Sequence, residues 1–251
     1  MRASQTQKQL ARSNSNEVQP LIQMLGIEKV YKTGAGDFIA LNDINLTFYS
    51  GEFVGIIGKS GSGKSTLANM ITGIDHPTRG SVVVQGETIS SMDESTMSIW
   101  RGNNLGIVFQ FFQLLPMLTL LENVLLPMDF CNKFTPPQRE ERAYELLKMV
   151  ELEEYANKLP NMTSGGQQQT TAIARALAND PPILIADEPT GNLDSRTAET
   201  VFELFCKLAD QGKTIIMVTH DPALAARTNR LVEIHDGRVI NDSRSQSGGR
   251  R

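Results

Sequence analysis

Residues 58–65 constrain the fold of this 251-residue chain more than any other segment. They read Gly-Lys-Ser-Gly-Ser-Gly-Lys-Ser, directly after the apolar run 53–57 and before the helical pattern 66–71. Glycines lack a Cβ, so the backbone can enter left-handed conformations and turn its N–H groups toward an anion. The helix that follows points the positive end of its dipole at the same place. The segment therefore predicts a strand, a phosphate-binding loop and a helix.

The residue types in this loop favour magnesium-ATP as the anion. Lys64 would place its charge on the β- and γ-phosphates, and the Ser65 hydroxyl would ligate Mg²⁺. A chance glycine-rich turn is the alternative, expected in on the order of one chain in a hundred of this size. The residues expected to bind the nucleotide here are Gly58, Lys59, Ser60, Gly61, Ser62, Gly63, Lys64, Ser65 and Thr66.

Asp187 and Glu188 end another apolar run, 183–186. Two adjacent carboxylates at the end of a buried strand are costly unless a cation lies near them. Asp187 can hold magnesium through its water shell, and Glu188 can accept a proton from an attacking water. An acidic turn without such a role is the alternative.

The apolar runs predict an α/β fold. Runs without polar alternation indicate parallel strands buried on both faces, and shorter runs joined by turns indicate an antiparallel β subdomain. The parallel strands are expected at 53–57, 183–186 and 214–219, and the antiparallel ones at 23–27, 38–48 and 81–84. A tight hairpin is expected around Asp-Gly at 236–237, and a helix at 136–150.

Composition and the two ends set further limits. A net charge of −4 and a pI near 5.5 argue against a nucleic-acid partner. The most apolar stretch, 111–128, is too interrupted to span a membrane, and the N-terminus lacks a secretory apolar core, so we expect a cytoplasmic chain. We expect a disordered leader at 1–20, one ATP-binding domain at 21–240 with a helical subdomain at about 111–175, and a disordered tail at 241–251.

Four further elements complete a recognisable set. Gln110 ends the strand-like run 105–109, Ser164-Gly165-Gly166-Gln167 precedes the helical pattern 168–178, Gly191-Asn192-Leu193-Asp194 follows the acidic pair, and His220 follows the third parallel strand. In this order the residues strongly resemble the nucleotide-binding domain of ABC transporters over about 24–240. The resemblance implies a P-loop NTPase fold with an ABC-type core, a parallel sheet, an antiparallel β subdomain and an α-helical subdomain.

The same resemblance implies roles within one copy of the chain. Tyr31 is where such domains place an aromatic that stacks on adenine, although an ordinary strand tyrosine is the alternative. Gln110 would contact magnesium and the lytic water, and it would begin the segment facing a membrane subunit. His220 would hydrogen-bond the γ-phosphate. With Glu188 these residues would form the catalytic set, and Ser65, Gln110 and Asp187 the magnesium set.

A second copy of the chain is also implied. Ser164, Gly165, Gly166 and Gln167 would grip the γ-phosphate of the ATP held by that copy, and Asp194 would lie at the interface. ATP would then close a head-to-tail dimer, and hydrolysis would open it. Such domains usually have Leu and Arg where this chain has Thr163 and Thr170. This departure concerns the anchoring of the helix, and we expect a working but slow ATPase.

The segments 106–116, 120–124 and 191–194 look most similar to one group within that family. It comprises the ATPases of macrolide exporters, lipoprotein-releasing machines, the cell-division pair with a permease-like partner and antimicrobial-peptide resistance pumps. The resemblance implies a separate membrane permease as partner, and a peripheral position on the cytoplasmic side of the membrane. A soluble ATPase switch for DNA repair or translation and a simple P-loop kinase are the alternatives.

Overall fold

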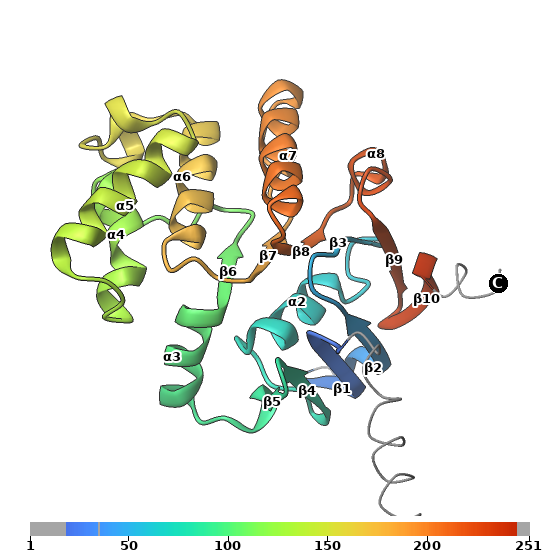
Figure 1. Cartoon of the computed structure of the whole chain (residues 1–251). Coiled ribbons are helices and arrows are strands. Elements are labelled where there is room, and N and C mark those ends of the chain that lie inside the picture. The colour runs from blue at the N-terminus through green and yellow to red at the C-terminus, as the bar shows by residue number, and fades with distance from the viewer. Residues whose placement is uncertain (1–18, 35, 245–251) are drawn as a thin grey trace, which may run out of the picture.

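A computed structural model describes residues 19–34 and 36–244. Two sheets, a helix between them and a separate group of helices make up this part of the chain (Figure 1). Most of the predicted leader, residues 1–18, and the end of the predicted tail, residues 245–251, lie outside the described residues.

The six-stranded sheet has the order β10-β9-β3-β8-β7-β6, and every neighbouring pair except β9–β10 is parallel. Its strands are β3 (Phe53–Ile57), β6 (Leu105–Val108), β7 (Ile183–Asp187), β8 (Thr214–Val218), β9 (Arg230–His235) and β10 (Arg238–Asp242). Alternate residues of β7 belong to two different hydrophobic clusters, Ile183 and Ile185 to one and Leu184 and Ala186 to the other. The prediction of parallel strands buried on both faces is confirmed.

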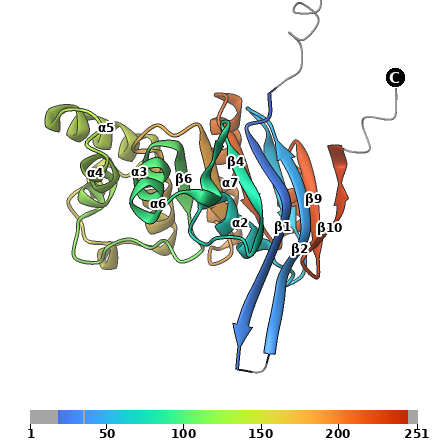
Figure 2. The same cartoon turned by 90° about the horizontal axis from the view of Figure 1, so that it is seen from below.

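The second sheet is antiparallel and has the order β2-β1-β4-β5. Its strands are β1 (Ile22–Thr33), β2 (Gly36–Phe48), β4 (Arg79–Val84) and β5 (Glu87–Thr88). Strands β1 and β2 are longer than predicted, and their hairpin extends past the rest of the molecule (Figure 2). Helix α2 (Lys64–Thr72) packs between the sheets, because its Leu67 and Ile71 share one core cluster with apolar residues of both.

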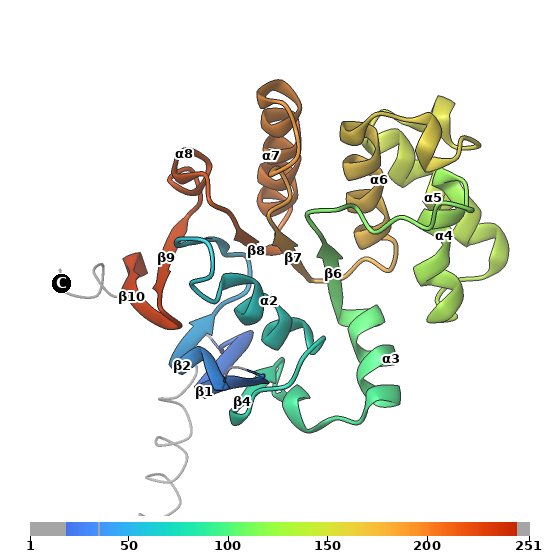
Figure 3. The same ribbon diagram turned by 180° about the vertical axis from the view of Figure 1, so that it is seen from behind.

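A helical subdomain lies between β6 and β7 in the sequence, as predicted, and beside the sheets in space (Figure 3). It contains α4 (Leu120–Phe130), α5 (Pro136–Met149), two short 3₁₀ turns (Glu153–Tyr155 and Pro160–Met162) and α6 (Gly165–Leu177). The 3₁₀ turn Ile89–Ser91 and helices α3 (Glu94–Asn104), α7 (Ser195–Asp210) and α8 (Pro222–Ala225) complete the described elements. None of the helices in residues 19–34 and 36–244 is long and apolar enough to cross a membrane.

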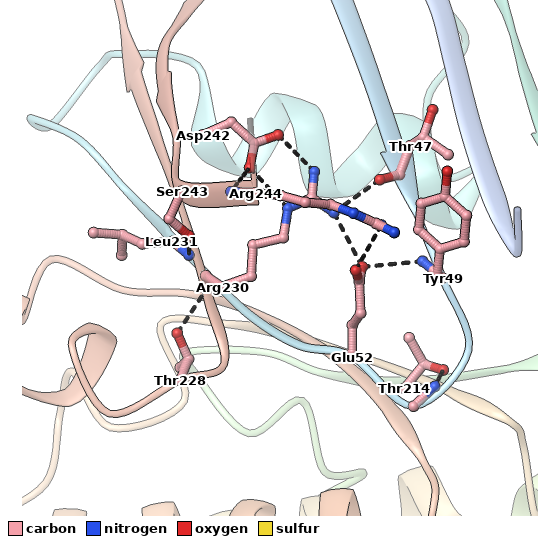
Figure 4. A network of polar contacts seen from close by, with 11 residues as sticks. Thr47, Tyr49, Glu52, Thr214, Thr228, Arg230, Leu231, Asp242, Ser243 and Arg244 are labelled. Carbon is pink, nitrogen blue, oxygen red and sulfur yellow. Dashed lines mark hydrogen bonds and ion pairs between the residues drawn. The ribbon is translucent and has the colours of Figure 1, made fainter. Parts of the chain in front are cut away.

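Charged side chains bind the edge strand β10 of the large sheet to its neighbours (Figure 4). Arg230, whose side chain is only 6% exposed, donates to both carboxylate oxygens of Asp242 at 2.8 and 2.6 Å and to Glu52 at 3.0 Å. Arg244 donates to the other Glu52 oxygen at 2.8 Å. Strand β10 continues to Asp242, one residue past the predicted start of the tail at Asn241, and the Asp242 carboxylate neutralises the buried Arg230.

Candidate active site

The phosphate-binding loop connects β3 to α2, and its glycines adopt the conformations that the sequence predicted. Gly58, Gly61 and Gly63 have φ values of 157°, 78° and 104°. At Gly63, the N-cap of α2, a Cβ would lie 2.5 Å from the Ala40 carbonyl oxygen, so no side chain fits there. The loop backbone can therefore approach an anion closely at the positive end of the helix.

Lys64 curls back over this loop. The residue is 7% exposed, and its Nζ donates to the carbonyl oxygens of Gly58 at 2.9 Å and Lys59 at 3.0 Å. Lys64 forms no ion pair with a carboxylate within residues 19–34 and 36–244, so its charge is available to a phosphate.

The β9–β10 turn supports the loop from behind. The Gly237 N–H donates to the Ser62 carbonyl oxygen at 2.9 Å, and the Asn42 N–H donates to the Gly237 carbonyl at 2.8 Å. A Cβ at Gly58 would lie 2.2 Å from the carbonyl oxygen of Ile234 in β9. The sequence predicted this hairpin but not its contact with the loop, because nothing local reveals a pairing so distant along the chain.

Ser65 and Asp187 meet where α2 begins and β7 ends. The Ser65 Oγ donates to an Asp187 carboxylate oxygen at 3.2 Å. Burial raises the pKa of Asp187 above its usual range and the charge of Glu188 adds to the rise, while the Ser65 bond and the Lys64 charge oppose it. A desolvated carboxylate beside a hydroxyl is an oxygen donor set that suits Mg²⁺, which takes one or two carboxylates and completes its shell with water and phosphate. These residues therefore fit a magnesium ion.

Glu188 and His220 face each other at the ends of β7 and β8. His220 approaches Glu188 Oε2 with its ring Nδ1 at 2.5 Å and with its backbone N–H at 3.3 Å. The Glu188 side chain is 13% exposed, and its backbone has a φ of 51°, a conformation that is rare for residues other than glycine. The carboxylate is thus aimed by the histidine and held in one place by its own strained turn.

A cavity of about 400 Å³ gathers these side chains. Gln110, which lies beyond the end of β6, reaches the same cavity as Glu188 and His220. The residues that line it are Phe38, Ala40, Ser60, Gly61, Gly63, Lys64, Ser65, Thr66, Gln110, Glu188 and His220. The structure therefore places most of the predicted phosphate loop and all three predicted catalytic residues around one space. The predicted site residues Gly58, Lys59, Ser62 and Asp187 are not among those that line it.

The aromatic wall of the cavity is Phe38, which the sequence analysis missed. Tyr31, the predicted adenine-stacking residue, is not among the lining residues: its hydroxyl donates to Asp75 at 2.8 Å, and the Lys29 Nζ lies 4.9 Å from the centre of its ring. Phe38 pairs with Tyr31 across the β1–β2 hairpin and remains 53% exposed. An aromatic residue directly opposite a candidate tyrosine in a predicted hairpin is the signal that could have identified it.

The segment 164–167 lies away from this cavity. Ser164 is the N-cap of α6, where the Gln167 N–H donates to its Oγ at 3.2 Å and its own N–H donates to Gln167 Oε1 at 2.9 Å. The sequence pattern predicted that this helix begins at Gln168, but α6 begins at Gly165. The capping box places the two glycines in the first turn of the helix.

Asp194 also caps a helix and also lies outside the cavity. It is the N-cap of α7 and accepts from the Arg196 and Thr197 N–H groups, both at 3.1 Å. Hydrogen bonds from the Thr197 side chain and backbone hold the pKa of Asp194 below its usual range. A Cβ at Gly166 would lie 2.5 Å from Thr197 Cγ2, so the beginnings of α6 and α7 are packed together.

Thr163 and Thr170, where the chain departs from the family pattern, bond locally. The Thr163 hydroxyl donates to the Pro160 carbonyl at 2.7 Å, and the Thr170 hydroxyl donates to the Gly166 and Gln167 carbonyls, both at 3.2 Å. Helix α6 is tied to its surroundings by other residues. Arg175, for example, donates to the Phe112 carbonyl at 2.8 Å and to the Gln113 carbonyl at 2.5 Å.

Comparison with known proteins gives one consistent result. Residues 41–191 match the family model described as ABC transporter. An ABC transporter ATP-binding protein of Methanocaldococcus jannaschii, MJ0796, is 46% identical over 228 residues, which cover 89% of this chain and 97% of the relative. The ABC transporter ATP-binding protein YvrO of Bacillus subtilis is 45% identical over 89% of this chain and 97% of its own length.

Longer relatives and a solved structure agree with this result. The macrolide export ATP-binding/permease protein MacB of Bradyrhizobium diazoefficiens is 42% identical over 91% of this chain, which spans 35% of the relative. A dimeric structure of MJ0796 in a post-hydrolysis state, bound to ADP and Pi, superimposes with a TM-score of 0.83 and 45% identity. The superposition covers 88% of this chain and 97% of that one.

Proposed function

Because the chain belongs to the ABC transporter family and is an ATP-binding, ATP-hydrolysing subunit, we propose that two copies close head-to-tail on two ATP molecules and thereby drive a separate membrane permease of the export or mechanotransmission type. The observation that carries the proposal is the single cavity shared by Lys64, Gln110, Glu188 and His220. The chain would act on the cytoplasmic face of the membrane as a peripheral subunit.

The residues that line the cavity, together with Asp187 beside Ser65, provide the groups that we assign to hydrolysis. Lys64 and the loop N–H groups bind the β- and γ-phosphates and offset their charge. Ser65, Gln110 and Asp187 would hold Mg²⁺, which when bound neutralises charge that develops on the transferred phosphoryl group. Glu188 takes a proton from the attacking water, while His220 keeps the carboxylate aimed at it.

The base of the nucleotide would lie against the hairpin of β1 and β2. Phe38 presents a half-exposed ring at the cavity wall, which makes it the residue that contacts the base or ribose in one copy. Tyr31 is the cross-strand partner of Phe38, and its side chain is held by Asp75 and Lys29. An apolar wall of this kind explains how the site adds affinity beyond the phosphates.

The proposed dimer rests on the N-terminus of α6, which does not contribute to the cavity of its own copy. The N-terminus of α6 carries an exposed Ser164 and glycine N–H groups beyond reach of its own cavity. Such a helix start binds anions, and a γ-phosphate held by a second copy supplies one. The relative MJ0796, which has been solved as a dimer, supports this arrangement.

A hollow between α3 and α4 is the proposed docking surface for the permease. It measures about 430 Å³ and is flanked by Ile99, 64% exposed, and Phe130, 79% exposed. Arg101 borders both this hollow and an adjoining one that contains Arg175 and Gln113. Neither arginine forms an ion pair within residues 19–34 and 36–244. The charge and the apolar walls together fit a permease helix with apolar side chains and a carboxylate.

Two native cysteines allow this docking to be tested. Cys131 lines the hollow and Cys206 lies on α7, so the two thiols report on different surfaces in labelling with a maleimide. Burial raises the pKa of both thiols, so both are compared at the same pH. Membranes containing the permease should slow the labelling of Cys131 in a Cys206→Ser variant and leave Cys206 unaffected in a Cys131→Ser variant. Equal protection of both thiols would contradict the proposed surface.

The catalytic proposal is tested by two substitutions. Lys64→Ala should abolish ATP binding, because it removes the cation that contacts the phosphates. Glu188→Gln preserves the shape of the site but removes the proton acceptor, so it should bind ATP, remain dimeric in light scattering, and turn over about 10²–10⁴-fold more slowly than wild type. Wild-type turnover by Glu188→Gln would show that another group is the base.

A further inference from the structure

Gln169 is a fully buried polar residue on α6 that the proposed mechanism does not use. Its exposed fraction is 0%, although glutamine is a residue type that usually lies at the surface. It belongs to the same helix that Ser164 caps, in the part packed against the sheet.

The amide of Gln169 bridges two catalytic segments. Its Nε2 donates to the carbonyl oxygen of Pro189 at 2.6 Å and, in a longer bond of 3.5 Å, to the carbonyl oxygen of Phe109. Pro189 directly follows Glu188, and Phe109 directly precedes Gln110. One side chain thus contacts the backbone next to the proposed base and next to the proposed water-binding glutamine.

The turn at Glu188 needs such support. Its positive φ of 51° is a strained conformation that persists only where surrounding contacts enforce it. From the sheet side, the Glu188 N–H donates to the Val218 carbonyl at 2.9 Å. Within the turn itself, the Gly191 N–H donates to the Glu188 carbonyl at 3.1 Å. From the helical side, Gln169 holds the adjoining peptide.

The amide oxygen of Gln169, Oε1, is buried and differs from its nitrogen in having no bonding partner within the described residues. A buried oxygen without a partner is unfavourable, whereas the bond from Nε2 satisfies the Pro189 carbonyl beside Glu188. A leucine or methionine of similar size would avoid that penalty but could not hold either carbonyl.

We propose that Gln169 is a positioning residue for hydrolysis: it fixes Glu188 and Gln110 relative to each other and couples both to α6, the helix that Ser164 caps. This inference rests on the roles proposed above for Glu188 and Gln110. A displacement of α6 changes the setting of the base and of the water-binding glutamine together, and both are in place only when α6 is.

Gln169→Met tests the inference, with Gln168→Met as the matched control. Gln168 is the adjacent residue of α6, but its Nε2 donates to Pro160 at 3.0 Å and Thr163 at 3.3 Å, which adjoin neither Glu188 nor Gln110. Gln169→Met should lower kcat about tenfold, which corresponds to ~1.4 kcal/mol, and leave the KM for ATP unchanged. Gln168→Met should leave the backbone around Glu188 and Gln110 as it is in wild type.

Hydrogen–deuterium exchange provides a readout that does not depend on turnover. Peptides covering 188–192 and 109–113 should exchange faster in Gln169→Met than in wild type and in Gln168→Met. Unchanged kcat and exchange would overturn the inference, and so would a joint change of kcat, KM and Tm, which would indicate a merely structural residue. A wild-type rate no higher than that of Lys64→Ala would instead refute the proposed catalytic function, and the exchange data would still decide on Gln169.

Discussion

Gly237 in the β9–β10 turn joins the C-terminal hairpin to the phosphate-binding loop, and replacing it with alanine isolates that support. Its φ is 71°, and a Cβ would lie 2.7 Å from the Ala40 carbonyl oxygen. That neighbour is backbone, so the turn must move away from β2, and the bond from the Gly237 N–H to Ser62 must lengthen. The variant is expected to weaken both the fold and the binding of ATP.

The magnitude follows from two terms. An alanine in the left-handed region costs ~1–2 kcal/mol, and losing one backbone hydrogen bond costs ~1 kcal/mol, for a total of ~2–3 kcal/mol. With roughly 2–4 °C per kcal/mol for a chain of this size, Tm should fall by roughly 4–12 °C. A displaced Ser62 misaligns the loop N–H groups, so ATP should bind about tenfold more weakly, or ~1.4 kcal/mol.

The chain contains a matched control for Gly237→Ala. Gly86, in the β4–β5 turn, has a φ of 83° and follows Gln85 with a φ of 52°, just as Gly237 follows Asp236 with a φ of 48°. A Cβ at Gly86 would meet no atom within 4 Å. Gly86→Ala should therefore lower Tm by roughly 2–8 °C, the effect of backbone strain alone, in thermal unfolding. Its affinity for ATP, measured by titration, should equal that of wild type. Equal ATP affinities of the two variants would refute the idea that the hairpin sets the loop.

Three other outcomes follow from single side chains. Phe38→Ala should raise the KM for ATP about two- to tenfold without lowering kcat, and Phe38→Tyr should restore it, as steady-state kinetics can measure. Asp242→Asn removes a partner of the buried Arg230 while Glu52 remains, so Tm should fall by several degrees. Burial raises the pKa of Asp242, but the bonds from Arg230 outweigh this and hold it below its usual range. The wild-type advantage over the asparagine variant is therefore complete above about pH 4 and is lost as the pH falls through the depressed pKa, which thermal scans at several pH values would show. The raised pKa of Asp187 predicts that the apparent affinity for magnesium weakens at a higher pH than for an ordinary aspartate, and that Asp187→Asn abolishes this dependence in magnesium titrations.

The parts of the site that depend on local pattern were predictable from the sequence. The run 53–57, the glycine-rich loop and the start of α2 are adjacent in the chain, and their conformations follow from missing Cβ atoms and helix geometry. The parallel strands were equally clear, because their apolar runs lack alternation. Glu188 and His220 could be placed because each follows such a strand, and parallel strands bring their carboxyl ends to one edge of the sheet.

Contacts between distant segments were not predictable in the same way. Helix α4 was missed because Pro127 lies inside its pattern, although Thr119 and Glu122 form a capping box at its start. The role of Phe38 depends on its pairing with Tyr31, and the support of the loop by Gly237 depends on how two sheet edges meet. Such contacts arise from tertiary packing, which the residue types of either segment do not specify alone.

Thr170 donates to carbonyls of its own helix, α6, whereas other residues join the start of that helix to neighbouring segments. Gly166 packs against Thr197, whose hydroxyl donates to Asp194 at 2.6 Å, so the starts of α6 and α7 form one unit. Gln169 ties the same helix to the turn after Glu188. If Ser164 binds the γ-phosphate of a second copy, as proposed, these contacts would connect it to Asp194 through Thr197 and to the turn after Glu188 through Gln169.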